Sequence, residues 1–277
     1  MVTNLGRAPG GVRRPGPDFD VVVLAGERGA SGALAAAAGV ARKVLAPVGG
    51  APVILNVLGA LDATDRFAAK WLSGPDRPVL EGTPALLEQE ALGWRWRPVE
   101  RSPAMSAAAA LGATGGTLPV LLTTADHAFL SREIVDFFCD RSKSSDGDVT
   151  IAFARHDEVM RVFPGSRRTG WRFSDGRVCG CNLYGFMTPG AQRVASFWQR
   201  VETLRKKPWR IVALLGPRLL ARYVAGRLTL DEALTGLSRA TGATIRAVIL
   251  PFPEAAVDLD TPADWELVKR HLRWRDE

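Results

Sequence analysis

The sequence lacks the features that would place the protein in a membrane or outside the cell. It has three cysteines among 277 residues, an odd number that fits no disulfide framework. No apolar run approaches the roughly 20 residues that a membrane-spanning helix needs. Residues 1–17 contain three arginines and no apolar segment, so they do not read as a secretory signal. We therefore expect a cytoplasmic protein with a disordered lead-in over 1–17 and one folded domain over 18–277.

The sequence also lacks the cysteine and histidine groups of a zinc site. Cys179 and Cys181 are one residue apart, but no second pair elsewhere in the chain matches them. The formal net charge is +7, and a basic balance suits a phosphorylated partner. Charge alone fits a nucleotide, a phosphosugar, a lipid phosphate or a nucleic acid equally well.

Apolar periodicity predicts strands that alternate with helices, which is the pattern of an α/β protein. The expected strands are 21–24, 67–72, 96–99, 119–123, 148–155 and 243–250, with an antiparallel pair at 171–173 and 177–186. The expected helices are 52–61, the first of the chain, then 83–92, 102–111, 131–139 and 189–204. A loop is expected over 141–147, and the region 189–241 is expected to be mostly helical.

The segment after the first strand has the composition of a phosphate-binding loop. Gly26, Gly29 and Gly32 follow the apolar strand, and glycine permits backbone conformations in which successive N–H groups converge on an anion. Lys43 lies further along the chain. It lacks the preceding glycine and following hydroxyl of a Walker A loop, and the glycine spacing differs from a dinucleotide fingerprint.

Two later segments carry carboxylates at positions suited to a metal. Asp126 follows a buried strand, and ligands of open α/β sheets bind beyond the carboxyl ends of strands. The neighbouring His127 is expected to be a surface residue at a helix start. Near the C-terminus, Thr261 is expected to cap a helix, which leaves Asp258 and Asp260 unexplained by capping. Either aspartate is a candidate for a second metal ligand; we favour Asp258 for that role and a structural role for Asp260.

Three motifs, in this order along the chain, resemble those of the MobA-like nucleotidyltransferases. They are LAG followed by K-x-L-x-P-V-x-G-x-P at 24–52, LLTTADHAFLS at 121–131, and D-x-D-T-P-x-D at 258–264. The resemblance spans residues 19–270. It implies a single-domain α/β protein of the GT-A, Rossmann-like nucleotidyltransferase type, with a mainly parallel mixed central sheet flanked by helices.

The resemblance also implies roles for individual residues. Lys43 and Asp126 are the expected catalytic residues, and Asp126 and Asp258 would hold Mg²⁺. Glu27 stands where the family usually has a glycine, and Arg28 is the expected substitute for an arginine of the family's loop. The expected nucleotide- and substrate-binding residues are Leu24, Ala25, Gly26, Glu27, Arg28, Lys43, Ser106 and Asn182.

The implied reaction is the Mg²⁺-dependent transfer of NMP from an NTP to a phosphorylated small-molecule or lipid acceptor, with release of pyrophosphate. We expect no nucleic-acid partner. Two alternatives stay open: a GT-A glycosyltransferase that uses a sugar nucleotide, and a non-catalytic nucleotide-binding protein. The altered loop at Glu27 would suit the second alternative.

A run of basic residues between 205 and 227 has two interpretations. We favour a solvated helix face, because an apolar helix face interleaved with such residues is usually core. The alternative is a docking surface for a phosphate group or for the surface of a membrane. The run contains no acidic residue, and its cations are Arg205, Lys206, Lys207, Arg210, Arg218, Arg222 and Arg227.

Overall fold

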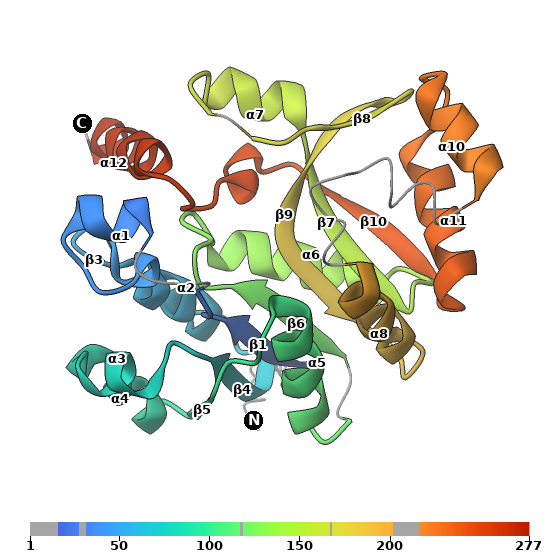
Figure 1. The fold of residues 1–277 in the computed structure, drawn as a ribbon. Coiled ribbons are helices and arrows are strands. Elements are labelled where there is room, and N and C mark those ends of the chain that lie inside the picture. Colours follow the sequence, from blue (N-terminus) through green and yellow to red (C-terminus); the bar gives the residue numbers. More distant parts are fainter. Residues whose placement is uncertain (1–15, 28–31, 117–118, 167, 202–215, 277) are drawn as a thin grey trace, which may run out of the picture.

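The computed structural model describes residues 16–27, 32–116, 119–166, 168–201 and 216–276. Its centre is a mixed eight-stranded sheet with the order β10-β7-β9-β6-β1-β4-β5, and β8 pairs with β9 (Figure 1). Strand β9 is antiparallel to both of its neighbours in that order, and the other neighbouring pairs are parallel. The strands are β1 Phe19–Leu24, β4 Phe67–Ser73, β5 Trp94–Arg97, β6 Val120–Thr124, β7 Val149–Arg155, β8 Trp171–Phe173, β9 Gly176–Phe186 and β10 Ile245–Leu250.

Strand β1 is buried on both faces, as an apolar run in a parallel sheet predicts. Val21 and Val23 belong to one core cluster, whereas Val22 and Leu24 belong to the cluster on the opposite face. The first cluster includes buried residues of α2 (Val53–Asp62) and α6 (Arg132–Lys143). The second includes buried residues of α5 (Pro103–Ala113), α8 (Ala191–Val201) and α11 (Leu230–Thr241). Helices therefore cover both faces of the sheet (Figure 1).

The helices connect the strands and are amphipathic or small-residue segments. They are α1 Ala33–Ala38, α2 Val53–Asp62, α3 Arg77–Glu81, α4 Pro84–Ala91, α5 Pro103–Ala113, α6 Arg132–Lys143, α7 His156–Val162, α8 Ala191–Val201, α10 Pro217–Val224, α11 Leu230–Thr241 and α12 Pro262–Asp276. Short 3₁₀ turns occupy Lys43–Leu45 (η1) and Pro253–Ala256 (η3), and a two-stranded ribbon joins β2 Pro47–Val48 to β3 Ala51–Pro52. Among the described residues, no helix combines the length and apolarity that crossing a membrane requires.

The fold class predicted from the sequence is confirmed, with local corrections. The alanine-rich segment forms α1, so the helix at Val53–Asp62 is the second of the chain and not the first. Strand β5 begins at Trp94, two residues earlier than predicted. Helix α6 continues to Lys143, which shortens the loop predicted over 141–147. Residues 1–15 lie outside the described part of the chain, so the disordered lead-in stays a prediction.

The segment before α12 is tied to the sheet through β6 and through Arg168. His127 and Asp258 form an isolated antiparallel bridge, and the Leu259 N–H donates to the Asp126 carbonyl at 3.0 Å. The Arg168 guanidinium lies 3.4 Å from Asp258 Oδ2 and 3.1 Å from Asp264 Oδ1, and it also donates to the Asp258 carbonyl. Arg168 therefore links the loop before β8 to the C-terminal segment.

The capping of α12 was predicted correctly. Asp264 accepts hydrogen bonds from the backbone N–H and the hydroxyl of Thr261, at 2.9 and 2.8 Å. The Thr261 hydroxyl in turn faces the Asp264 N–H at 3.2 Å. This reciprocal pair satisfies N–H groups that have no partner inside the helix. It fixes where the chain turns from the sheet into α12.

Gly74 lies at a crowded point where β4 ends. Its φ is +87°, and a Cβ atom added there would lie 2.7 Å from Val99 Cγ1 and 3.1 Å from the Ala25 carbonyl oxygen. Gly59 in α2 is the opposite case, because it is exposed and a Cβ atom there would meet nothing within 4 Å.

We predict that Gly74→Ala lowers the free energy of unfolding by about 1–3 kcal/mol, because it combines a left-handed backbone with a steric clash. The matched control Gly59→Ala should raise it by about 0.5–1 kcal/mol, the difference in helix propensity. Urea denaturation of both variants measures the two effects. Equal stabilities would contradict the crowding at Gly74.

We predict that Arg168→Gln lowers the free energy of unfolding by about 3–5 kcal/mol, because it leaves two mostly buried carboxylates without their cation. The control is Arg132→Gln, which breaks the exposed pair with Asp136 and should cost at most about 1 kcal/mol. Denaturant midpoints of the two proteins measure the difference. A wild-type midpoint for Arg168→Gln would show that the guanidinium is not the link described above.

Candidate functional site

The carboxyl ends of three parallel strands meet at one edge of the sheet. Leu24, the last residue of β1, is aligned with Ser73 of β4 and with Thr124 of β6. The hydrogen bonds continue one residue further: the Ala25 N–H donates to the Ser73 carbonyl at 2.8 Å, and the Ala125 N–H donates to the Leu24 carbonyl at 2.9 Å. The loops that follow β1 and β6 therefore leave the sheet side by side, which is where open α/β sheets bind ligands.

Lys43, in η1, points into this edge and contacts two carboxylates. Its Nζ lies 2.5 Å from Asp126 Oδ2 and 2.8 Å from Asp260 Oδ1. Only 18% of the Lys43 side chain and 14% of the Asp126 side chain are exposed, whereas 61% of Asp260 is exposed. The structure thus brings together Lys43 and Asp126, the two residues that the resemblance named as catalytic. It adds Asp260, for which only a structural role was expected.

The protonation preferences of this pair follow from burial and mutual attraction. Burial on its own would lower the pKa of Lys43, but the charges of Asp126 and Asp260 outweigh it and raise that pKa above its ordinary value. Burial would likewise raise the pKa of Asp126, yet the adjacent Lys43 ammonium lowers it overall. Both groups are therefore charged at neutral pH.

Asp258 is the third carboxylate of this region, and its pKa is shifted in the opposite direction to that of Asp126. Burial and then the negative charge of Asp126 raise the pKa of Asp258 well above its usual range, although Arg168 and Lys43 partly oppose the shift. The Oδ1 atoms of Asp126 and Asp258 are buried and have no hydrogen-bond partner among the described residues. An unpaired buried carboxylate oxygen is costly, so a bound cation would stabilise both groups.

These two carboxylates fit a magnesium ion. The described residues contain no group of three or more His, Cys, Asp or Glu side chains that could hold a metal. Magnesium does not require one, because it is usually bound through one or two carboxylates together with phosphate oxygens and water. Asp126 and Asp258 supply two such carboxylates with an unpaired oxygen each.

His127 is completely buried, so the prediction of a surface histidine was wrong. Burial lowers the pKa of His127 to about 4, which keeps the ring neutral at physiological pH. The reason for the error is the bridge to Asp258, a contact 131 residues away along the chain that covers this position. His127 is therefore a buried, neutral group that follows Asp126 in the chain.

The loop after β1 reaches Lys43 through Glu27. Glu27 Oε2 accepts a hydrogen bond from the Lys43 backbone N–H at 3.1 Å. The carboxylate that replaces the family's usual glycine thus holds the start of η1 beside Gly26. Arg28, the expected substitute for the family's arginine, lies outside the described residues.

A pocket of about 390 Å³ opens beside this loop. Ser106 lies at its edge, and its buried hydroxyl accepts a hydrogen bond from the Glu100 N–H at 2.8 Å. The resemblance implies that Ser106 binds the nucleotide or substrate, and the structure places it on a pocket wall, where it anchors the loop before α5. The lining residues are Leu24, Gly26, Glu27, Val99, Glu100, Arg101, Ser102, Pro103 and Ser106.

Asn182 lies in β9 at a bulge. Pairing of β7 with β9 changes register between Ile151 and Phe153, and Asn182 has a φ of +49° there. Asparagine tolerates this left-handed conformation better than most residues, which gives Asn182 a structural reason to occur. Its role as a hydrogen-bonding group for a substrate stays a prediction.

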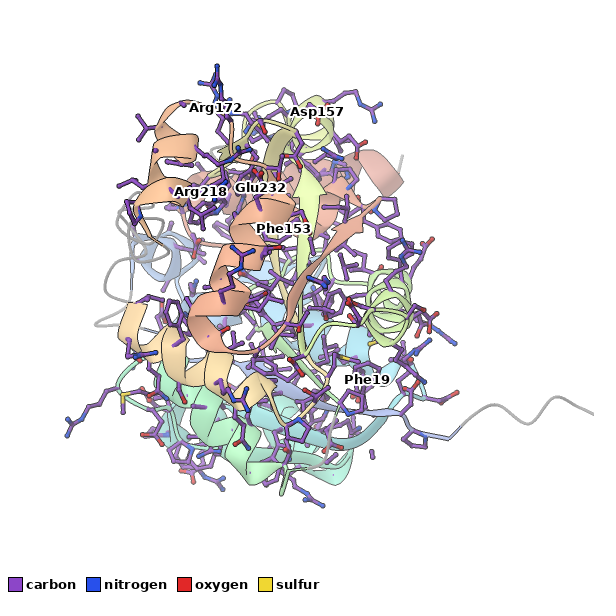
Figure 2. All side chains as sticks on the ribbon, turned by 90° about the vertical axis from the view of Figure 1, so that its right-hand side faces the viewer. Phe19, Phe153, Asp157, Arg172, Arg218 and Glu232 are labelled. Atoms are coloured by element: carbon purple, nitrogen blue, oxygen red, sulfur yellow. The ribbon has the colours of Figure 1, made fainter. Side chains whose placement is uncertain are left out.

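The basic run is described only from residue 216 onward, so Arg205, Lys206, Lys207 and Arg210 lie outside the described residues. Within the described part, Arg222 is paired with Glu232 at 2.7 Å and is already neutralised. A pocket of about 730 Å³ lies between α10 and α11, with Arg218 and Glu232 in its wall (Figure 2). It is larger than the pocket beside Gly26, but it contains none of the residues gathered at the strand ends. We therefore place the candidate site at the strand ends.

The sequence did not indicate the contacts that two residues make at the site. Asp260 contacts Lys43 across 217 positions of the chain, and Arg168, which no motif of the sequence includes, contacts Asp258 across 90 positions. The motif D-x-D offered a signal for Asp260. No local pattern distinguishes Arg168 from the other arginines of the chain.

Solved structures similar to this fold include a hypothetical transferase, a synthetase in complex with CTP and a cytidylyltransferase. A hypothetical transferase from Thermus thermophilus has a TM-score of 0.73 and 27% identity over 90% of this chain and 99% of that chain. CMP:2-keto-3-deoxy-manno-octonic acid synthetase in complex with CTP has a TM-score of 0.56 and 14% identity, over 93% and 99% of the two chains. The 2-C-methyl-D-erythritol 4-phosphate cytidylyltransferase of Thermus thermophilus has a TM-score of 0.52 and 14% identity, over 92% and 99%.

Sequence comparison gives a more specific result than these structures. Among curated proteins, none is similar enough in sequence to count as a relative of this chain. The model of one protein family, described as the MobA-like NTP transferase domain, matches residues 21–169, which is more than half of the chain. This match includes the loop after β1, Lys43 and Asp126. The chain therefore belongs to the MobA-like NTP transferase family.

Proposed function

We propose that the protein transfers a nucleotidyl group from an NTP to a phosphorylated acceptor, releases pyrophosphate and depends on Mg²⁺. The observation that carries this proposal is the meeting of Lys43, Asp126 and Asp260 at the carboxyl ends of β1 and β6, next to a pocket. Similar structures include a synthetase in complex with CTP and a 2-C-methyl-D-erythritol 4-phosphate cytidylyltransferase. Those names support an NTP donor and a phosphorylated acceptor here.

The proposed chemistry is an in-line substitution at phosphorus. An oxygen of the acceptor phosphate attacks the α-phosphorus of the NTP, and the bond between that phosphorus and the pyrophosphate oxygen breaks. A phosphate acceptor is already ionised at neutral pH, so the reaction needs no general base to activate it. Catalysis of this kind depends on positioning and on charge stabilisation.

Each residue of the site has one proposed task. The pocket beside Gly26 and Ser106 holds the nucleoside, and Lys43 neutralises the phosphates that leave. Asp126 and Asp258 hold Mg²⁺, which when bound supplies positive charge to the phosphate oxygens. Arg168 keeps Asp258 in place through two of its own nitrogen atoms.

The acceptor side is the less defined half of the proposal. We place the acceptor beside β9, with Asn182 as a hydrogen-bonding group. The basic run from 205 to 227 stays a candidate for contact with the acceptor or with an anionic lipid surface. Because Arg222 is already paired with Glu232, we favour a soluble phosphorylated acceptor and a solvated face for the described part of the run.

We predict that pyrophosphate is released when the protein is given Mg²⁺, the correct NTP and a phosphorylated acceptor. The four NTPs are first ranked by Mg²⁺-dependent thermal stabilisation, because a ligand that binds only the folded state raises the melting temperature. Asp126→Asn should lower kcat by roughly a hundredfold or more, since one ligand of the charge-stabilising ion is lost.

The control for that experiment is Asp146→Asn, which removes an exposed carboxylate paired with Arg246 and should leave the rate unchanged. Release of a nucleoside diphosphate from a sugar nucleotide would indicate a glycosyltransferase instead. Nucleotide binding with no turnover for any acceptor would indicate a nucleotide-binding protein. Full activity of Asp126→Asn would remove this residue from the site.

We predict that Lys43→Ala weakens the binding of an NTP at least about tenfold more than the binding of the corresponding nucleoside, because the ammonium acts on phosphates. Calorimetric titration of both ligands measures the two losses. Equal losses for the NTP and the nucleoside would show that Lys43 supports the fold of the pocket and does not contact phosphate.

A further inference from the structure

Lys43 and the proposed metal share one carboxylate. The Lys43 ammonium lies 2.5 Å from Asp126 Oδ2 and 2.8 Å from Asp260 Oδ1, so carboxylates already engage two of its three donors. A divalent cation on Asp126 would have this ammonium as a close neighbour of like charge. Repulsion between them is strong because both Lys43 and Asp126 are mostly buried.

Both cations of the site already occupy carboxylates that a divalent cation would need. The Lys43 ammonium is shared by Asp126 and Asp260, and the Arg168 guanidinium is shared by Asp258 and Asp264. Arg168 is fixed to Asp258 and Asp264, so Lys43 is the cation whose partners can change. A lysine carries its single ammonium on a long, flexible side chain. It can therefore move between anions more easily than an arginine whose planar guanidinium binds through two nitrogen atoms.

We propose that Lys43 makes metal binding conditional on the nucleotide. Without a triphosphate, the ammonium competes with Mg²⁺ for Asp126. A bound triphosphate adds several negative charges, gives Lys43 a new anionic partner and leaves Asp126 to the metal. The inference rests on the proposed function only in taking an NTP as the ligand. It assigns Lys43 a second task, namely suppression of metal binding in the absence of substrate.

This arrangement has a consequence for the order of binding. Metal and nucleotide enter as one complex, or the nucleotide enters first. The protein does not hold free Mg²⁺ in advance. Metal affinity and nucleotide affinity are therefore coupled, and by linkage each ligand strengthens the other by the same factor.

The test is a titration of the nucleotide-free protein with Mn²⁺, followed by electron paramagnetic resonance. Mn²⁺ accepts the same oxygen ligands as Mg²⁺. We expect Lys43→Met to bind Mn²⁺ roughly tenfold more tightly than the wild type or better, because the competing charge is gone. Lys43→Arg keeps the charge and should bind as weakly as the wild type.

The matched control is Lys143→Met, which removes a lysine charge from an ion pair with Asp18 outside the site. Its Mn²⁺ affinity should equal that of the wild type. Equal or weaker Mn²⁺ binding by Lys43→Met would overturn the inference. A gain in the Lys143→Met control as large as that in Lys43→Met would also overturn it, because it would show a non-specific charge effect.

The wild-type protein gives a second test in case Lys43→Met does not fold. Mg²⁺ alone should leave the melting temperature unchanged, and Mg²⁺ with the NTP should raise it well above the NTP alone. A marked rise with Mg²⁺ alone would overturn the inference. Neither measurement requires turnover, so a failure to release pyrophosphate and a failure of this inference are separate results.

Discussion

The contact of the Lys43 ammonium with Asp126 and Asp260 is the interaction on which the candidate site depends. Its partners lie 83 and 217 positions away along the chain, so the contact joins the first third of the protein to its middle and its C-terminus. Three carboxylates this close to each other would repel strongly in a partly buried site. Lys43 and Arg168 offset part of that repulsion, and burial together with the charge of Asp126 still raises the pKa of Asp258. Once an anionic ligand engages Lys43, Asp126 and Asp258 are suited to receive a further cation.

The sheet supplies the rigid frame for this contact. Strands β1, β4 and β6 are parallel and in register at their last residues, which fixes the directions of the loops that carry Gly26 and Asp126. Strand β9 runs antiparallel between β6 and β7 and separates these strands from β7 and β10 (Figure 1). The loops that follow β1 and β6 thus lie beside the pocket and Lys43, whereas we place the acceptor beside β9. Function of this kind depends on the loops, and the sheet determines where they begin.

Much of this arrangement could be predicted from local sequence, and the exceptions share a physical cause. The buried strand 21–24, Asp126 after a strand and the cap at Thr261 each have a local pattern, and the structure places each as expected. His127 was misplaced because its burial results from a bridge to Asp258 that no local pattern encodes. The contacts of Arg168 and Asp260 are equally long-range. Local patterns therefore predict elements and their ends, whereas charge pairing between distant segments becomes visible only in the folded chain.

The central claim is that the carboxylates at the ends of β6 and before α12 hold the metal of a metal–nucleotide complex, with Lys43 on the phosphates. The most direct measurement is a crystal structure with Mn²⁺ and a non-hydrolysable NTP, in which the anomalous signal locates the metal. The account predicts a metal peak on the Asp126 and Asp258 carboxylates and the Lys43 ammonium on a phosphate oxygen. A nucleotide bound between α10 and α11, or Lys43 still bridging Asp126 and Asp260 beside a bound nucleotide, would contradict it.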